Sequence, residues 1–180
     1  MLEILMILAA LIGIAILGVL VVAAMRPNTF RIARSITISA PADKIFPLVN
    51  DPKAMNGWSP FVKTDPSMRI AYSGPASGRG AAFDWDSTGR GGKGRIEVTD
   101  ASPSSSVGMS LVMSKPFACD NQIRFDLAPA AGDATSVTWA MSGPWPYLHR
   151  VMGTIFNSDK MVGGEFEKGL RDLKAIAERA

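Results

Sequence analysis

The sequence predicts an α+β fold in which an antiparallel sheet of about seven strands packs on one long C-terminal helix, behind an N-terminal transmembrane helix. Three observations support this prediction: an uncharged apolar run opens the chain, segments of alternating apolar and polar residues follow, and the last segment has helical periodicity. The 180 residues, 47% of them hydrophobic, suffice for one domain and an appendage. We therefore divide the chain into an anchor (1–26), a linker with the start of the first strand (27–34) and a folded domain (35–180).

The apolar run "ILMILAALIGIAILGVLVVAAM" (4–25) contains neither a charge nor a proline, and as a helix it is long enough to cross a hydrocarbon core of about 30 Å. A secretory signal peptide is the alternative. Such a peptide has a positively charged start and a shorter apolar stretch, whereas Glu3 precedes this run. We therefore expect a single-pass, uncleaved membrane anchor. Because Arg26, Arg31 and Arg34 follow the run, the positive-inside rule predicts that the folded domain lies in the cytoplasm.

The folded domain is expected to open with a strand and two short helices. After "RPN", the segment "FRIARSITISA" alternates apolar and polar residues, as a half-buried strand does. The next segment, "PADKIFPLVNDPKAMNGW", has a helical pattern with Pro41 at a first-turn position. Pro47 and Pro52 divide it into two short helical pieces.

Six further strands are predicted by alternating segments that are separated by clusters of turn residues. These strands are 68–73, 80–86, 94–100, 107–113, 117–127 and 135–142. Short turns between consecutive strands make the sheet an antiparallel meander. One of the turns contains Gly89, Gly91 and Gly94 in a G-x-G-x-x-G spacing. Strand patterns flank it on both sides, and no helix follows to bind a phosphate, so we interpret it as a hairpin turn.

The last segment, 158–178, is predicted to be one long amphipathic helix. Its apolar residues Met161, Val162, Phe166, Leu170, Leu173, Ile176 and Ala177 fall on one face. Gly163, Gly164 and Gly169 each lower its intrinsic stability by about 1 kcal/mol relative to alanine. The helix therefore needs a partner, and the sheet is the candidate.

Several of these segments carry a family resemblance. "RSITISAPADKIFPLVND", "WSPFVKTDPSM", "SGPASGRGAAFDWDS", "GKGRIEV" and "TSVTWAMSG" resemble successive motifs of the START-like helix-grip superfamily, in its SRPBCC polyketide cyclase/dehydrase-like branch. The resemblance covers the chain from Ser35 to about Ala177. It implies a curved sheet wrapped around the C-terminal helix, with a cavity between them. The superfamily includes lipid carriers, aromatase-cyclases and hormone receptors, so the resemblance implies a fold and not a single activity.

The strand residues that share the helix-facing parity are large and apolar, and we expect them to contact a small apolar or amphipathic ligand, such as a lipid or a polyketide-like compound. Aromatic residues in the two connections complete the set. The predicted ligand-binding residues are Trp58, Phe61, Phe83, Trp85, Met109, Leu111, Met113, Phe125, Trp139, Met141, Trp145, Tyr147, Phe156 and Phe166.

Two alternatives to this ligand site remain open. The same side chains suit an ordinary packed core, although ten methionines favour an adaptable binding surface. The apolar connection "GPWPYLHRVMGTIF" forms either the mouth of the pocket or a loop that docks on the sheet edge or on the bilayer surface.

The sequence shows no catalytic constellation. The acidic residues Asp84, Asp86, Glu97 and Asp126 have the outward parity. We interpret His149, the single histidine, as a solvated or capping residue, and Cys119, the single cysteine, as a small buried apolar residue.

One histidine and one cysteine also argue against a metal site, and no motif predicts a cofactor. Lysine and arginine exceed aspartate and glutamate by only 19 to 16, without a basic run, so nucleic acid is not an expected partner.

The leading hypothesis is therefore a membrane-anchored binding domain for a small hydrophobic ligand. The second hypothesis is a cyclase or dehydratase in which Tyr147, His149 or an ordered water handles protons. The third is a structural interaction module with a filled core. The sequence leaves the oligomeric state open.

Overall fold

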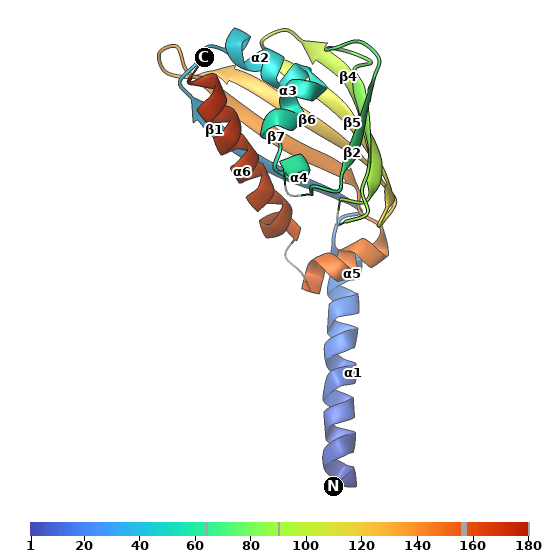
Figure 1. Cartoon of the computed structure of the whole chain (residues 1–180). Helices are drawn as coiled ribbons and strands as arrows, with labels where there is room; N and C mark the ends of the chain where they lie inside the picture. Colours follow the sequence, from blue (N-terminus) through green and yellow to red (C-terminus); the bar gives the residue numbers. More distant parts are fainter. Residues whose placement is uncertain (64, 90, 156–157, 180) are drawn as a thin grey trace.

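A computed structural model of the protein describes residues 1–63, 65–89, 91–155 and 158–179 (Figure 1). A long helix, α1 (Leu2–Met25), projects from one end of a domain in which a seven-stranded sheet is covered on one face by helices. The strands are β1 (Thr29–Ile38), β2 (Arg69–Ser73), β3 (Ala82–Asp86), β4 (Lys93–Ser102), β5 (Ser106–Lys115), β6 (Cys119–Pro129) and β7 (Thr135–Pro144). The other helices are α2 (Ala42–Asn50), α3 (Pro52–Trp58), α4 (Pro60–Lys63), α5 (Tyr147–Ile155) and α6 (Ser158–Ala177).

The predicted antiparallel meander is confirmed. The strand order is β1-β7-β6-β5-β4-β3-β2, and every neighbouring pair is antiparallel. The first and last strands of the chain are neighbours, because β1 forms one edge of the sheet and pairs with β7 from Thr29 to Ile38. β1 therefore occupies 29–34 of the segment that was predicted to hold a linker and the start of the first strand. Two register shifts in β4, at Lys93/Gly94 and Val98/Asp100, interrupt its pairing with β5 and favour a curved sheet.

The segment 41–58 forms two short helices, as predicted, but only Pro52 marks the division between them, and Pro47 lies inside α2. Asp51 ends α2 and caps α3, since its carboxylate accepts hydrogen bonds from the backbone N–H groups of Lys53 and Ala54. Pro52 occupies the first turn of α3, where its missing N–H costs nothing. A third short helix, the single turn α4, follows directly after Ser59.

Two predicted strand starts were too early. Residues 80–81 precede β3, because Gly78 and Gly80 have positive φ values of 78° and 87° and form a turn. Phe117 precedes β6 and lies in the turn between β5 and β6, where its side chain is 66% exposed. Phe117 therefore lies outside the hydrogen-bonded ladder that determines which face of the sheet a residue takes.

The glycine-rich segment is a hairpin turn, as predicted. It joins β3 to β4, and the backbone N–H of Ser87 donates to the carbonyl of Gly92. Gly92 has a φ of 64°, and a Cβ there would meet the carbonyl of Lys115 on β5. The glycine is needed for chain geometry and for close packing between strands.

The last helix packs on the inner face of the sheet, as predicted. Phe166, Leu170 and Leu173 are buried beneath it. The Phe166 ring stacks on that of Trp139 from β7, with centroids 4.2 Å apart and planes at 9°. Trp58 meets the Trp139 ring edge-on at 5.5 Å, so α3, β7 and α6 share one aromatic core.

The outer face of the sheet is polar. Arg95 on β4 pairs with Asp84 at 2.7 Å and with Glu97 at 3.1 Å, and Arg124 on β6 pairs with Asp126 at 2.7 Å. These carboxylates point away from the core, which confirms their predicted parity.

Candidate functional site

The inner face of the sheet changes from fully buried to half-buried along its length. At the end distant from α1, Val98, Val107, Phe125 and Val137 have no exposed surface. Toward the end that carries α1, the inner-face residues Ile96, Leu111, Met113 and Met141 are only partly buried. We call these four residues the half-buried end. The packing of the helices thus fills one end of the inner face and leaves apolar surface accessible at the other.

The predicted ligand-binding residues fall into three groups. The core holds Trp58, Phe83, Trp85, Met109, Phe125, Trp139 and Phe166, all at most 7% exposed. Leu111, Met113 and Met141 belong to the half-buried end. Phe61 lies on α4 at the border of the core, where it is 43% exposed and meets the rings of Trp139 and Phe166 edge-on. Trp145 and Tyr147 lie elsewhere, at the junction with α1, and Phe156 lies outside the described residues.

Asn121 on β6 is a polar residue of the inner face that the sequence analysis did not single out. The Asn121 side chain lies over Gly143 of β7, and a Cβ at Gly143 would collide with Asn121 Oδ1. Only 7% of Asn121 is exposed. Its amide nitrogen contacts two weak acceptors, Cys119 Sγ at 3.5 Å and Met141 Sδ at 4.0 Å. Its Oδ1 has no hydrogen-bond partner among the described residues. The parity that it shares with Cys119 and Ile123 was the signal that would have identified it.

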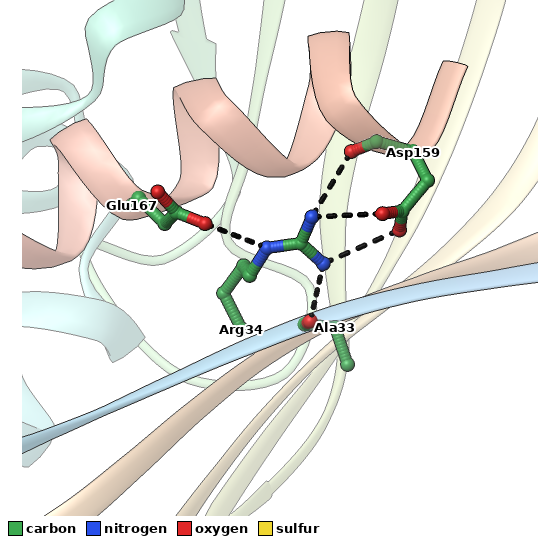
Figure 2. Close-up of polar contacts among 4 residues, drawn as sticks. All are labelled: Ala33, Arg34, Asp159 and Glu167. Carbon is green, nitrogen blue, oxygen red and sulfur yellow. Dashed lines mark hydrogen bonds and ion pairs between the residues drawn. The ribbon is translucent and has the colours of Figure 1, made fainter. Parts of the chain in front are cut away.

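Arg34 brings a charge to the same face at the β1 edge, and α6 neutralises it (Figure 2). Its guanidinium donates to Glu167 Oε1 at 2.8 Å and to Asp159 Oδ2 at 2.9 Å. The hydrogen bonds from Arg34 hold the pKa of the Asp159 carboxyl below its usual range, and those same bonds raise the pKa of Arg34. A Cβ at Gly163 would collide with the Arg34 guanidinium, so this glycine leaves room for the ion pairs between β1 and α6.

The connection before the last helix forms α5, a helix that the sequence analysis did not predict. It lies across the end of α1 (Figure 1). The hydroxyl of Tyr147 donates to the carbonyl of Leu20 at 3.0 Å. The guanidinium of Arg26 donates to the carbonyl of Gly153 at 3.1 Å, and that of Arg150 donates to the carbonyl of Arg26 at 2.8 Å. These bonds fix α5 to α1.

The two side chains considered for acid–base chemistry have their partners outside the inner face of the sheet, because the Tyr147 hydroxyl is bonded to α1 and His149 meets the turn after β5. Tyr147 and His149 lie on α5, and the His149 ring meets the exposed ring of Phe117 edge-on at 6.1 Å. Burial raises the pKa of the Cys119 thiol, which keeps the thiol protonated and makes it a poor nucleophile at neutral pH. The arrangement at the half-buried end therefore suits apolar contact with one amide acceptor.

A separate hollow of about 290 Å³ lies at the edge of the sheet, between α3 and the edge strand β2. Lys53 and Tyr72 line it, and the Lys53 ammonium lies 5.4 Å from the centroid of the Tyr72 ring. The Tyr72 hydroxyl accepts a hydrogen bond from the Asn56 amide at 3.2 Å. None of the predicted ligand-binding residues lines this hollow.

The α1 helix has the length and composition needed to cross a membrane. Its 24 residues span about 36 Å, and within the described structure Ala23 is its buried residue. Membrane anchors and signal sequences share these properties.

A family model described as polyketide cyclase / dehydrase and lipid transport matches residues 29–178. The match begins at the first residue of β1 and ends just after α6. A comparison with curated proteins finds no match.

Solved structures share the fold. Protein MLL2253 from Mesorhizobium loti is similar with a TM-score of 0.60 and 17% identity, over 84% of this chain and 98% of that chain. Protein CV1439 from Chromobacterium violaceum has a TM-score of 0.57 and 17% identity, over 85% of this chain and 99% of that chain. A protein from Thermobifida fusca has a TM-score of 0.59 and 19% identity, over 83% and 93%. These similarities support the helix-grip fold and, at such identities, only the fold.

Proposed function

The chain belongs to the polyketide cyclase/dehydrase and lipid transport family, of the START-like helix-grip type, and we propose that it is a membrane-anchored binding domain for a small apolar or amphipathic ligand. The ligand is held against the half-buried end of the inner face, between the sheet and α6. The same proposal places the folded domain in the cytoplasm, with α1 in the membrane.

The observation that carries the proposal is the gradient of burial along the inner face. Leu111, Met113 and Met141 present apolar surface that is only partly buried, next to a core that is already filled. A ligand that removes such apolar surface from water is stabilised in its complex by about 25 cal/mol per Å² of surface buried. Methionine side chains adapt to ligands of varied shape.

Asn121 favours an amphipathic ligand over a pure hydrocarbon. Its Oδ1 is buried without a partner among the described residues, and such an atom costs free energy until it accepts a hydrogen bond. A ligand hydroxyl placed beside Leu111 and Met141 supplies that donor. Binding is favoured over catalysis because the Tyr147 hydroxyl is bonded to the Leu20 carbonyl and the His149 ring packs against that of Phe117.

Two features support an anchor over a cleaved signal sequence. The Tyr147 hydroxyl bonds to the carbonyl of Leu20, and the contact with α5 buries Ala23, so the folded domain uses α1 as a packing partner. Cleavage near Arg26 would remove both contacts.

Displacement of a fluorescent fatty acid tests the ligand proposal. The chain 26–180 would be titrated with the probe, then with fatty acids, sterols and aromatic polyketides, and native mass spectrometry would identify any molecule that copurifies. We expect Leu111→Trp to weaken binding at least tenfold, because the indole fills the half-buried end.

Val112→Trp is the matched control, because Val112 is the next residue on β5 and points to the outer face, where it is 46% exposed. It should leave binding unchanged. Thermal unfolding of each variant verifies that both remain folded. A chain that unfolds cooperatively but carries and binds none of these compounds would refute the proposal, as would equal losses in the two variants.

A further inference from the structure

We infer that α5 and the turn between β5 and β6 form a surface that lies in the interface of the bilayer, at the boundary of headgroups and acyl chains. This surface consists of Phe117, Tyr147, Leu148 and Met152, and we call it the collar. The inference rests on the proposed membrane anchor and adds a second contact with the same membrane.

Exposed apolar side chains gather at this end of the domain. Among the described residues after α1, the most exposed large apolar side chains are Phe117, Leu148 and Met161, each at 66%. Met152 and Tyr147 follow on α5 at 45% and 43%. Exposed apolar groups this close together mark an interaction surface.

The collar is one surface although its residues come from two segments. The ring of Phe117, in the turn after β5, meets the ring of His149 on α5 with centroids 6.1 Å apart. The turn therefore lies against α5, which crosses the end of α1 (Figure 1).

The depth of the collar in the bilayer follows from the hydrogen bond between Tyr147 and α1. Leu20 lies five residues before the end of α1 at Met25, which is about 7.5 Å along the helix axis. The Tyr147 hydroxyl reaches the Leu20 carbonyl, so the first residue of α5 lies beside the last turns of the apolar run. When α1 crosses the bilayer, this bond places α5 at the level of the interface and not in the solvent above it.

The composition of this junction matches that interface. Tyrosine and tryptophan are typical of the interface because one end of each ring is apolar and the other is polar. Tyr147 has its ring beneath the Arg150 guanidinium at 5.4 Å, and Trp145 lies beneath that of Arg26 at 5.6 Å. Lys115 adds an exposed cation beside Phe117. Cations at this level attract the phosphates of anionic lipids.

The collar gives the ligand a route to the binding surface. Met113 and Met141 lie two and three residues from the ends of β5 and β7, at the end of the domain that carries α1. With the collar in the interface, the half-buried end faces the acyl chains. An apolar ligand then moves between bilayer and sheet without crossing water.

Depth-dependent quenching tests the inference in the full chain, reconstituted in vesicles of phosphatidylcholine and phosphatidylglycerol. In a Cys119→Ala background, single cysteines carry an environment-sensitive fluorophore at Leu148→Cys or Phe117→Cys. Ile176→Cys is the control, since Ile176 is exposed on α6 near the C-terminus, at the opposite end of the domain (Figure 1). Ile12→Cys, in the middle of α1, reports insertion of the anchor.

Probes at 148 and 117 should be quenched severalfold more by lipids with a nitroxide near the headgroup than by aqueous iodide. The probe at 176 should show the reverse order, and the probe at 12 should respond to a nitroxide near the end of the acyl chain. If the probe at 12 responds while those at 148 and 117 behave like that at 176, the collar is refuted and the anchor stands. If the probe at 12 also responds only to iodide, the anchor itself fails and the inference fails with it.

Introducing negative charges on α5 gives a second test of the collar. Leu148→Glu combined with Met152→Glu should move the probe at 117 toward the aqueous phase, with iodide quenching increased severalfold, while the probe at 12 is unchanged. No change at 117 would show that α5 does not hold the turn at the membrane.

Discussion

Single glycines decide how α6 meets the sheet. Gly169 lies against the aromatic core, where an added Cβ would be 2.7 Å from Cζ3 of Trp139 and 2.9 Å from Cδ of Pro60. Gly164, on the same helix, has nothing within 4 Å of such a Cβ. Glycine is unfavourable in a helix, so Gly169 is explained by close packing, whereas Gly164 has no packing contact that explains it.

We therefore expect opposite effects from the same substitution at these two positions. Gly169→Ala should lower the free energy of unfolding by about 1–3 kcal/mol, because the methyl group overpacks rigid buried rings. Gly164→Ala should raise it by about 0.4–1 kcal/mol through helix propensity and a less flexible unfolded chain. Chemical denaturation with equal m-values in both variants measures the difference. Destabilisation of the same size at both sites would contradict this account of the packing.

At the scale of elements, Asp65 joins two connections that are distant in the sequence. Its carboxylate accepts hydrogen bonds from the hydroxyls of Ser67 and Ser87 and from the backbone N–H of Gly91 at 2.9 Å. The segment before β2 is thereby tied to the hairpin turn between β3 and β4. Hydrogen bonds from Ser67, Ser87 and Gly91 lower the pKa of Asp65 from 3.8 to about 2.

The lowered pKa of Asp65 predicts a pH dependence with a defined sign. Because the folded pKa lies below the unfolded value, the tie contributes stability that is complete above the unfolded pKa of 3.8 and is lost as the pH falls toward about 2. Asp65→Asn should be less stable than the natural chain at pH 6, and the difference should shrink below pH 4. Denaturation curves at several pH values measure it. A difference that stays constant down to pH 2 would exclude the carboxylate as its source.

For the molecule as a whole, the proposed anchor would determine on which membrane the domain works. If α1 spans the bilayer uncleaved, the full chain should stay in the membrane fraction through high salt and alkaline carbonate. Some 20 buried apolar residues hold a helix in the bilayer, whereas salt screens surface electrostatics. The chain 26–180 should be released into the soluble fraction. A mature protein that begins near Arg26 in a soluble extracytoplasmic fraction would identify α1 as a signal peptide.

The structure shows which arginines near α1 can be replaced to test the proposed orientation in the membrane. Arg34 is bound to Asp159 and Glu167, so replacing it would disturb α6 as well as the charge balance (Figure 2). Neutral substitutions at Arg26 and Arg31 alone should weaken the cytoplasmic activity of a reporter fused after Ala180. The single substitution Arg31→Gln is the cleaner of the two, because Arg26 also donates to the carbonyl of Gly153. Full reporter activity on the opposite side of the membrane in the natural chain would overturn the proposed orientation.

The sequence by itself determined most of the sheet and the two long helices α1 and α6. Alternation fixed which face each strand buries, because successive side chains point to opposite sides, and Asp84 and Phe83 therefore lie on opposite faces. The apolar run determined α1 in the same way, since its composition alone sets its solubility in a bilayer. Periodicity is a local property, so neighbours along the chain suffice to reveal it.

Only the tertiary structure decided which inner-face residues are core and which remain accessible. Phe125 and Met113 have the same parity, but the first is fully buried in the core and the second is only partly buried. It also decided that Gly163 makes room for Arg34 and that the apolar connection is a helix tied to Leu20. The last two features depend on contacts between residues more than 100 positions apart in the chain, such as Leu20 and Tyr147. A local pattern carries no information about such contacts until the fold brings the partners together.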